Sequence, residues 1–122
     1  MAAWLFLALL TKHFVADFPL QFPRHYLAKG IYGRWGGYEH VLIHAALTFL
    51  VLVFFRIHPV DLIVALSCGE AFAHYHIDWA KMNLNRHWNL KPDNSEKFWW
   101  LLGFDQWLHH ATYAAIVLIV VT

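Results

Sequence analysis

Apolar residues dominate four stretches of the chain, and prolines, glycines or charged residues separate these stretches. They cover residues 2–18, 39–57, 60–79 and 98–122. Each is close to the roughly 20 residues that a helix needs to cross a hydrocarbon core about 30 Å thick. Prolines stand in the connections between them, where a helix cannot continue. The pattern therefore predicts four membrane-spanning helices.

Composition agrees with this interpretation. The chain has 122 residues, of which 60% are hydrophobic and only 14% are charged. A soluble domain of this size cannot bury so much apolar surface, although a tight oligomer could hide it. We therefore expect an all-α fold, an integral membrane four-helix bundle in which residues 1–122 form a single transmembrane domain.

Charge predicts the orientation of this bundle. Lysine and arginine residues concentrate in two long connections, 22–38 and 82–97, whereas the short turn around Pro59 offers only Arg56. By the positive-inside rule, both long connections face the cytoplasm as short interfacial segments. The expected location is the cell inner membrane, as a multi-pass protein in contact with lipid and with both termini on the non-cytoplasmic side. The net charge of +1 and the absence of a basic stripe give no indication of nucleic-acid binding.

Ionisable residues interrupt every apolar stretch as pairs spaced four residues apart. This spacing places both members of a pair on one helix face, about one turn apart. At 1.5 Å per residue from the outer helix ends, the pairs fall on two shared levels, roughly 16–21 Å and 22–27 Å deep. The pairs are His13 with Asp17, His40 with His44, His74 with Asp78, and Asp105 with His109.

These eight residues are predicted to be metal ligands. An ionisable group in hydrocarbon costs at least about 2.5–3.5 kcal/mol, so eight of them need partners. Histidine and carboxylate ligands suit a divalent Zn, Mn or Fe ion, as one ion or as two, whereas the single cysteine excludes a thiolate site. The alternative interpretation is a network of His–Asp hydrogen bonds that stabilises the bundle without metal.

Some polar residues near these levels are candidates for catalysis. A carboxylate beside a metal-bound water can act as a general base, and an inward-facing lysine or amide can stabilise or orient a substrate. Lys81 could equally extend toward the interface, which is the more ordinary behaviour of a lysine near a helix end. The candidate catalytic residues are Asp17, Asp78, Glu70, Lys81 and Gln106.

The segments HFVADFPLQ, HVLIH, HYHIDWAK and FDQWLHH resemble, in this order, the motifs of a bacterial and phage family of small multi-pass membrane proteins. That family carries a domain of unknown function, number 3307, and it implies no settled activity. Glu70 lies outside the motif pattern. The matching positions are His13, Asp17, Gln21, His40, His44, His74, Asp78, Lys81, Asp105, Gln106 and His109.

A metal ion bound at this site could activate water inside the membrane. We therefore expect a metal-dependent hydrolase that acts on a lipid or another membrane-embedded substrate. The sequence does not distinguish between cleavage of a phosphoester, an ester and an amide bond. An iron-dependent oxygenase or desaturase-like enzyme is an alternative, because His40 with His44 and His109 with His110 resemble parts of membrane histidine boxes. A non-enzymatic metal-binding, transport or phage membrane protein is the remaining alternative.

Overall fold

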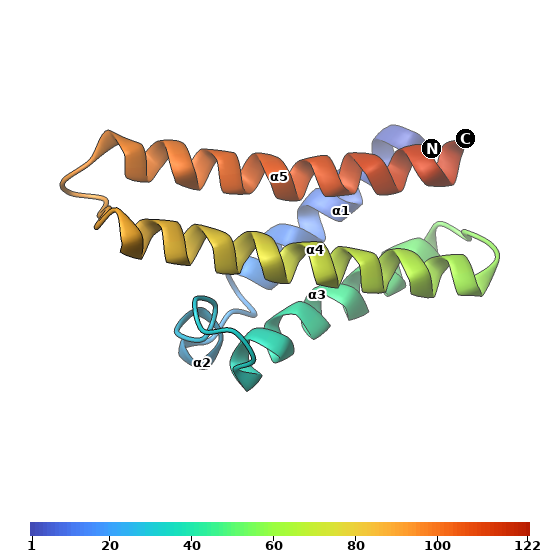
Figure 1. Cartoon of the computed structure of the whole chain (residues 1–122). Coiled ribbons are helices and arrows are strands. Elements are labelled where there is room, and N and C mark those ends of the chain that lie inside the picture. The colour runs from blue at the N-terminus through green and yellow to red at the C-terminus, as the bar shows by residue number, and fades with distance from the viewer.

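The computed structural model describes all 122 residues, and its regular elements are five helices. Four are long: α1 (Ala2–Asp17), α3 (Trp35–Phe54), α4 (Val60–His87) and α5 (Glu96–Val121). The short helix α2 (Pro23–Tyr26) lies in the connection between α1 and α3 (Figure 1). The chain contains no strand, so the predicted all-α class is confirmed.

The four long helices form a ring around one interior. Helix α3 packs against α1 and α4, and α5 packs against the same two helices, whereas the backbones of the diagonal pairs do not approach each other. Figure 1 shows α4 and α5 running antiparallel, joined by a loop at one end of the bundle. Both chain termini and the α3–α4 turn lie at the opposite end, which we call the terminal end. Helix α2 packs against α3, near the loop end.

Helix α3 begins and ends earlier than the predicted range 39–57. Gly33 has a φ of 80° and Arg34 is extended, so the chain is already in position to start a helix at Trp35. The helix ends at Phe54 because Arg56 adopts a left-handed conformation with a φ of 57°. The apolar residues Phe55 and Ile57 on either side of Arg56 hid this boundary, since apolar residues occur both in a helix and in a buried turn.

Helix α4 is 28 residues long and continues well past the predicted end at Trp79. Residues 80–87 contain neither proline nor glycine, so nothing in this part of the sequence stops the helix. It ends shortly before Asn89, which has a φ of 50°. Helix α5 starts two residues before the predicted Phe98, because the Ser95 side chain caps it by accepting from the Lys97 amide. The second connection is therefore only residues 88–95.

The interior of the bundle has an apolar part and a polar part. The buried side chains outside glycine comprise 12 hydrophobic and 13 polar or charged ones, an unusually polar interior for a protein domain. The polar residues fill the middle of the bundle. The apolar cluster lies at the terminal end and consists of Leu5, Leu9, Leu52, Ile57, Ile63, Tyr113, Ile116 and Val117.

The outer surface is rich in large apolar side chains on every long helix, for example Phe14, Phe54, Phe72 and Trp107, each more than half exposed. By length and composition, however, α3 is the one helix that qualifies as a membrane span. Helix α1 has only 16 residues, and α4 and α5, although long enough, are not apolar enough over a spanning length. A single such helix is weak evidence, so the predicted set of four spans is not confirmed.

Candidate metal centre

All eight predicted ligands lie in the polar part of the interior, and each has less than a tenth of its surface exposed. Each long helix contributes two of them on its inward face, as the four-residue spacing predicted. The interior of one bundle therefore gathers His13, Asp17, His40, His44, His74, Asp78, Asp105 and His109.

Asp17 is the carboxylate on which most of the histidines converge. Its Oδ1 atom lies 2.9 Å from His44 Nε2, 3.1 Å from His40 Nε2 and 3.7 Å from His74 Nε2. Its Oδ2 atom lies 3.2 Å from His13 Nε2. One carboxylate from α1 thus faces imidazole nitrogens from α1, α3 and α4.

Two of these nitrogens have no hydrogen-bond partner. His40 Nε2 and His74 Nε2 are both fully enclosed and unpaired, although buried polar atoms in proteins are nearly always satisfied. Candidate ligand atoms of Asp17, His40, His44 and His74 all lie within 4.8 Å of one another. Three imidazoles and one carboxylate at this spacing are a donor set that could hold a divalent ion.

A second group of candidate ligands consists of His74, Asp78 and His109. Asp78 Oδ2 lies 3.2 Å from His74 Nε2, and Asp78 Oδ1 lies 3.3 Å from His109 Nε2. His109 Nε2 is also 3.4 Å from Asp105 Oδ1, one turn away on the same helix. The two groups are therefore adjacent, and His74 belongs to both.

Lys29 extends into this second group from the connection that follows α2. Its Nζ atom lies 3.1 Å from Asp78 Oδ2, and its side chain is 8% exposed. Burial lowers the pKa of Lys29, but the attraction of Asp78 and Asp17 outweighs burial, so the pKa is raised and the ammonium form persists. The sequence had indicated only a cytoplasmic positive charge here, because helical periodicity does not place a residue in a connection.

Glu70 lies behind the histidines rather than among the candidate ligand atoms. Its Oε1 atom is 3.6 Å from the Nδ1 atoms of both His44 and His74, on the ring side opposite their Nε2 atoms. Lys12 Nζ donates to the same oxygen at 3.0 Å, and the Tyr113 hydroxyl donates to it at 3.2 Å. This position favours an orienting role for Glu70 over the predicted role as a base, because carboxylates behind ligating histidines commonly orient the rings.

The remaining predicted catalytic residues meet at Asp105, near the edge of the layer. Lys81 Nζ and Gln106 Nε2 both donate to Asp105 Oδ2, at 3.3 and 3.0 Å. Gln106 also places its Oε1 atom 3.2 Å from His13 Nε2. Both side chains are only partly buried, so this edge is the more accessible side of the layer.

Several buried polar residues were missed from the sequence. Thr48 and Tyr113 continue the four-residue spacing of their helices by one step, and both donate to Glu70, so the periodicity could have revealed them. His25 is fully buried with its Nε2 atom 3.2 Å from Glu39 Oε2. Nothing in the spacing indicated His25, since it lies on the short helix α2. The matching position Gln21 donates to the Asp17 carbonyl at the end of α1.

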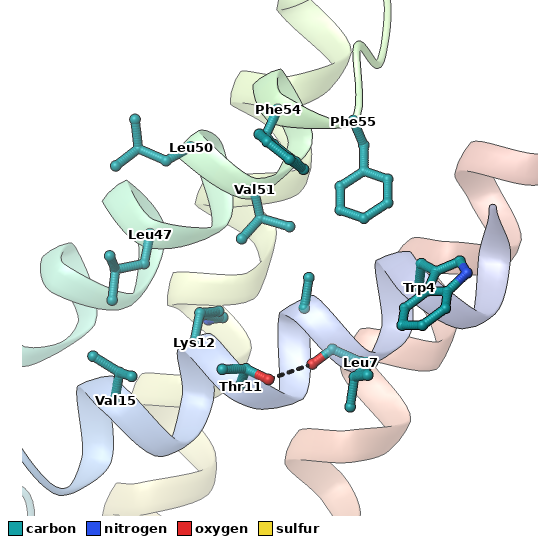
Figure 2. A pocket seen from close by; sticks show the side chains of 11 residues that line it. Trp4, Leu7, Thr11, Lys12, Val15, Leu47, Leu50, Val51, Phe54 and Phe55 are labelled. Atoms are coloured by element: carbon teal, nitrogen blue, oxygen red, sulfur yellow. Dashed lines mark hydrogen bonds between the residues drawn. The ribbon is translucent and has the colours of Figure 1, made fainter.

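An apolar groove of about 550 Å³ lies between α1 and α3 beside the polar layer. Nine of its eleven lining residues are hydrophobic, and Figure 2 shows them on the facing sides of the two helices. Lys12 is the one charged residue in its lining. Because Lys12 Nζ is also 3.2 Å from His44 Nδ1, the groove adjoins the histidine cluster.

Fold and site together define a small all-helical protein whose interior is rich in histidine and carboxylate side chains. The chain belongs to the family described as protein of unknown function (DUF3307), whose family model matches residues 5–122. This confirms the family membership that the motifs indicated, and the match includes every residue of the polar layer. No curated protein and no solved structure matches the chain.

Proposed function

We propose that this protein is a metal-dependent hydrolase that acts on a lipid or another membrane-embedded substrate. The observation that carries the proposal is the convergence of His40, His44 and His74 on Asp17, with two ring nitrogens left unpaired. A divalent ion there would satisfy those nitrogens. Zn²⁺, Mn²⁺ and Fe²⁺ all accept this combination of imidazole and carboxylate ligands.

The distribution of side chains supports a membrane location. Large apolar residues lie exposed on all four long helices, whereas the interior holds the charged groups. In water this arrangement would leave far more apolar surface exposed than a monomer tolerates, but in lipid it is favourable. We infer a multi-pass protein of the inner membrane. Its basic connections, which include Arg34 and Lys91, face the cytoplasm and its termini face the other side.

The chemistry follows from the kinds of residue around the centre. A divalent ion held there would lower the pKa of a bound water, so that the hydroxide formed near neutral pH could attack an ester, phosphoester or amide. Of the carboxylates nearby, Asp78 would be the proton acceptor, because its oxygens lie 3.2 Å from His74 Nε2 and 3.3 Å from His109 Nε2 and so beside the proposed ion. Lys81 and Gln106, at the accessible edge, would bind the polar part of a substrate.

The groove between α1 and α3 supports a substrate with a hydrocarbon chain. Its volume lies within the range of about 300–1,000 Å³ that is typical of ligand pockets. Its lining residues run from Trp4 to Val15 along α1, which corresponds to about 16 Å of helix. A chain bound there would have one end beside Lys12 and so at the level of the histidine cluster.

The test is hydrolysis by protein reconstituted in lipid and loaded with Zn²⁺, Mn²⁺ or Fe²⁺. Phosphorylated lipids, acyl esters and lipid amides should be assayed with wild type, His44→Ala and, as a matched control, the exposed His87→Ala. We expect metal-dependent turnover of one substrate class, retained by His87→Ala and lost in His44→Ala. Equal turnover by wild type and His44→Ala, or no turnover of any class by metal-loaded wild type, would contradict the proposal.

A second function, iron-dependent oxygenation, is favoured by one feature of the same cluster. Asp17 with two of its histidines matches the two-histidine, one-carboxylate set of non-haem iron oxygenases. Measuring oxygen consumption in the same assay, with Fe²⁺ and a lipid substrate, separates the two functions. Oxygen consumption without hydrolysis would select the oxygenase.

A further inference from the structure

The two groups of candidate ligands share one histidine, and this sharing limits how many ions the centre can hold. His74 Nε2 lies 3.7 Å from Asp17 Oδ1 and 3.2 Å from Asp78 Oδ2, so the same atom faces both groups. One imidazole nitrogen binds one metal ion. If His74 completes the group around Asp17, the second group keeps only Asp78 and His109 of its own members.

Charge distinguishes the two groups. Asp78 already has a cation beside it, the Lys29 ammonium at 3.1 Å from Oδ2. Asp17 has no lysine or arginine within ion-pair distance, and its partners are the four histidines. The carboxylate without a compensating cation is therefore the one at which three other ligands converge.

The other two buried carboxylates, Glu70 and Asp105, each have a lysine ammonium group beside them, as Asp78 does. Lys12 lies 3.0 Å from Glu70, and Lys81 lies 3.3 Å from Asp105. With the histidines neutral, as metal ligation requires, and the three lysines protonated, four carboxylates and three ammonium groups leave one negative charge in the layer, at Asp17. One divalent ion changes the balance to one positive charge, which a hydroxide or a substrate anion would neutralise. A second divalent ion would leave three positive charges without partners, and unpaired buried charge is strongly unfavourable.

We propose that the centre holds one divalent ion, between Asp17, His40, His44 and His74, and that the Lys29 ammonium takes the place of a second ion beside Asp78. This inference rests on the proposed metal centre and adds its stoichiometry, its position and the class of its further ligand. That ligand is a monoanion, such as hydroxide or an anionic oxygen of the substrate. The Lys29 charge lies next to the ion and so favours the same anionic ligand.

The experiment is a titration of metal-free protein with Co²⁺, which gives visible absorption when it replaces Zn²⁺ or Fe²⁺. Bound metal is counted independently by mass spectrometry after removal of free ion. We expect wild type to saturate at one equivalent. Saturation at two equivalents would overturn the inference while leaving a metal-dependent hydrolase possible, whereas no bound ion would overturn both.

Variants test the position of the ion and the role of Lys29. Asp17→Asn should lose the ion and Asp78→Asn should keep one equivalent; the reverse pattern would place the ion in the second group. Lys29→Met should bind a second equivalent, whereas Lys29→Arg and the exposed control Lys97→Met should stay at one. A folded Lys29→Met protein that still binds one equivalent would show that Lys29 does not exclude a second ion.

Discussion

Glu70 is a single residue whose contacts bear directly on the proposed metal centre. Its carboxylate lies behind His44 and His74 and is held by Lys12, Thr48 and Tyr113. Its Oε1 atom lies 3.6 Å from the Nδ1 atom of each ring, and a hydrogen bond formed there on metal binding would fix the ring orientation and raise the basicity of a ligating histidine. The pair with Lys12 also keeps a buried ammonium group compensated.

We expect Glu70→Gln to weaken both metal binding and folding. Metal affinity should fall by about 10- to 100-fold, the usual effect of losing an outer partner of a ligating histidine. The free energy of unfolding should fall by about 3–5 kcal/mol, because Lys12 is left as an unpaired buried charge. Chelator competition measures the first quantity and denaturation of the metal-free protein measures the second.

The double variant Lys12→Met/Glu70→Gln separates the two effects. It removes the unpaired charge, so we expect most of the stability to return while the metal affinity stays low. Unchanged metal affinity in Glu70→Gln would contradict the orienting role.

At the scale of elements, the α2 connection is the part that completes the site. Helix α2 and the residues after it pack so closely on α3 that a Cβ on Gly36 would lie 2.0 Å from the carbonyl oxygen of Arg24. This close approach brings Lys29 and His25 into the interior. By contrast, a Cβ on Gly69 in α4 or on Gly103 in α5 would meet nothing within 4 Å.

Gly36→Ala should therefore force α2 away from α3. We expect a loss of about 1–3 kcal/mol in the free energy of unfolding, the range typical of overpacked sites. Gly69→Ala and Gly103→Ala are matched controls, for which stability should be unchanged or up to about 1 kcal/mol higher because alanine favours the helix. Thermal denaturation compares the three variants. A Gly36→Ala protein as stable as these controls would show that the close approach is unimportant.

The groove between α1 and α3 gives a second prediction at this scale. Ala8→Phe would fill part of its volume, so kcat/KM should fall about 10-fold or more for a long-chain substrate and much less for a short-chain one. Ala46→Phe, on an exposed part of α3 outside the groove, is the matched control. Metal content should be normal in both variants. Equal losses for long and short chains in Ala8→Phe would contradict chain binding in the groove.

Helix positions and inward faces could be predicted from the sequence, because hydrophobic length and four-residue spacing are local signals. They correctly gathered His13, His44, His74 and His109 in one interior. Helix ends were harder to predict, since α3 ends at Phe54, two residues before a left-handed Arg56 that has no sequence signal. Lys29 and His25 could not be predicted at all, because their positions depend on how a connection folds back onto α3.

At the scale of the whole molecule, an apolar exterior around a charged interior predicts membrane insertion, and the basic residues of the two connections predict that both face the cytoplasm. In a Cys68→Ser background, an impermeant maleimide should label His58→Cys in intact cells but should label Arg34→Cys and Lys91→Cys only after permeabilisation. Arg34 is chosen because it is exposed, whereas Lys29 in the same connection is buried. Labelling of Arg34→Cys and Lys91→Cys in intact cells would reverse the orientation, and recovery of the protein in the soluble fraction would exclude the membrane.

The central claim is that the interior binds a metal ion through histidine. X-ray absorption at the metal edge, on protein purified without chelator or added metal, tests it most directly. We predict a stoichiometric ion with nitrogen and oxygen neighbours at about 2.0–2.2 Å and the outer-shell scattering of several imidazoles. His44→Ala should lose this signal and the exposed His87→Ala should keep it. An edge no higher than background, or a shell without imidazole, would contradict the claim and leave the layer as a hydrogen-bonded network.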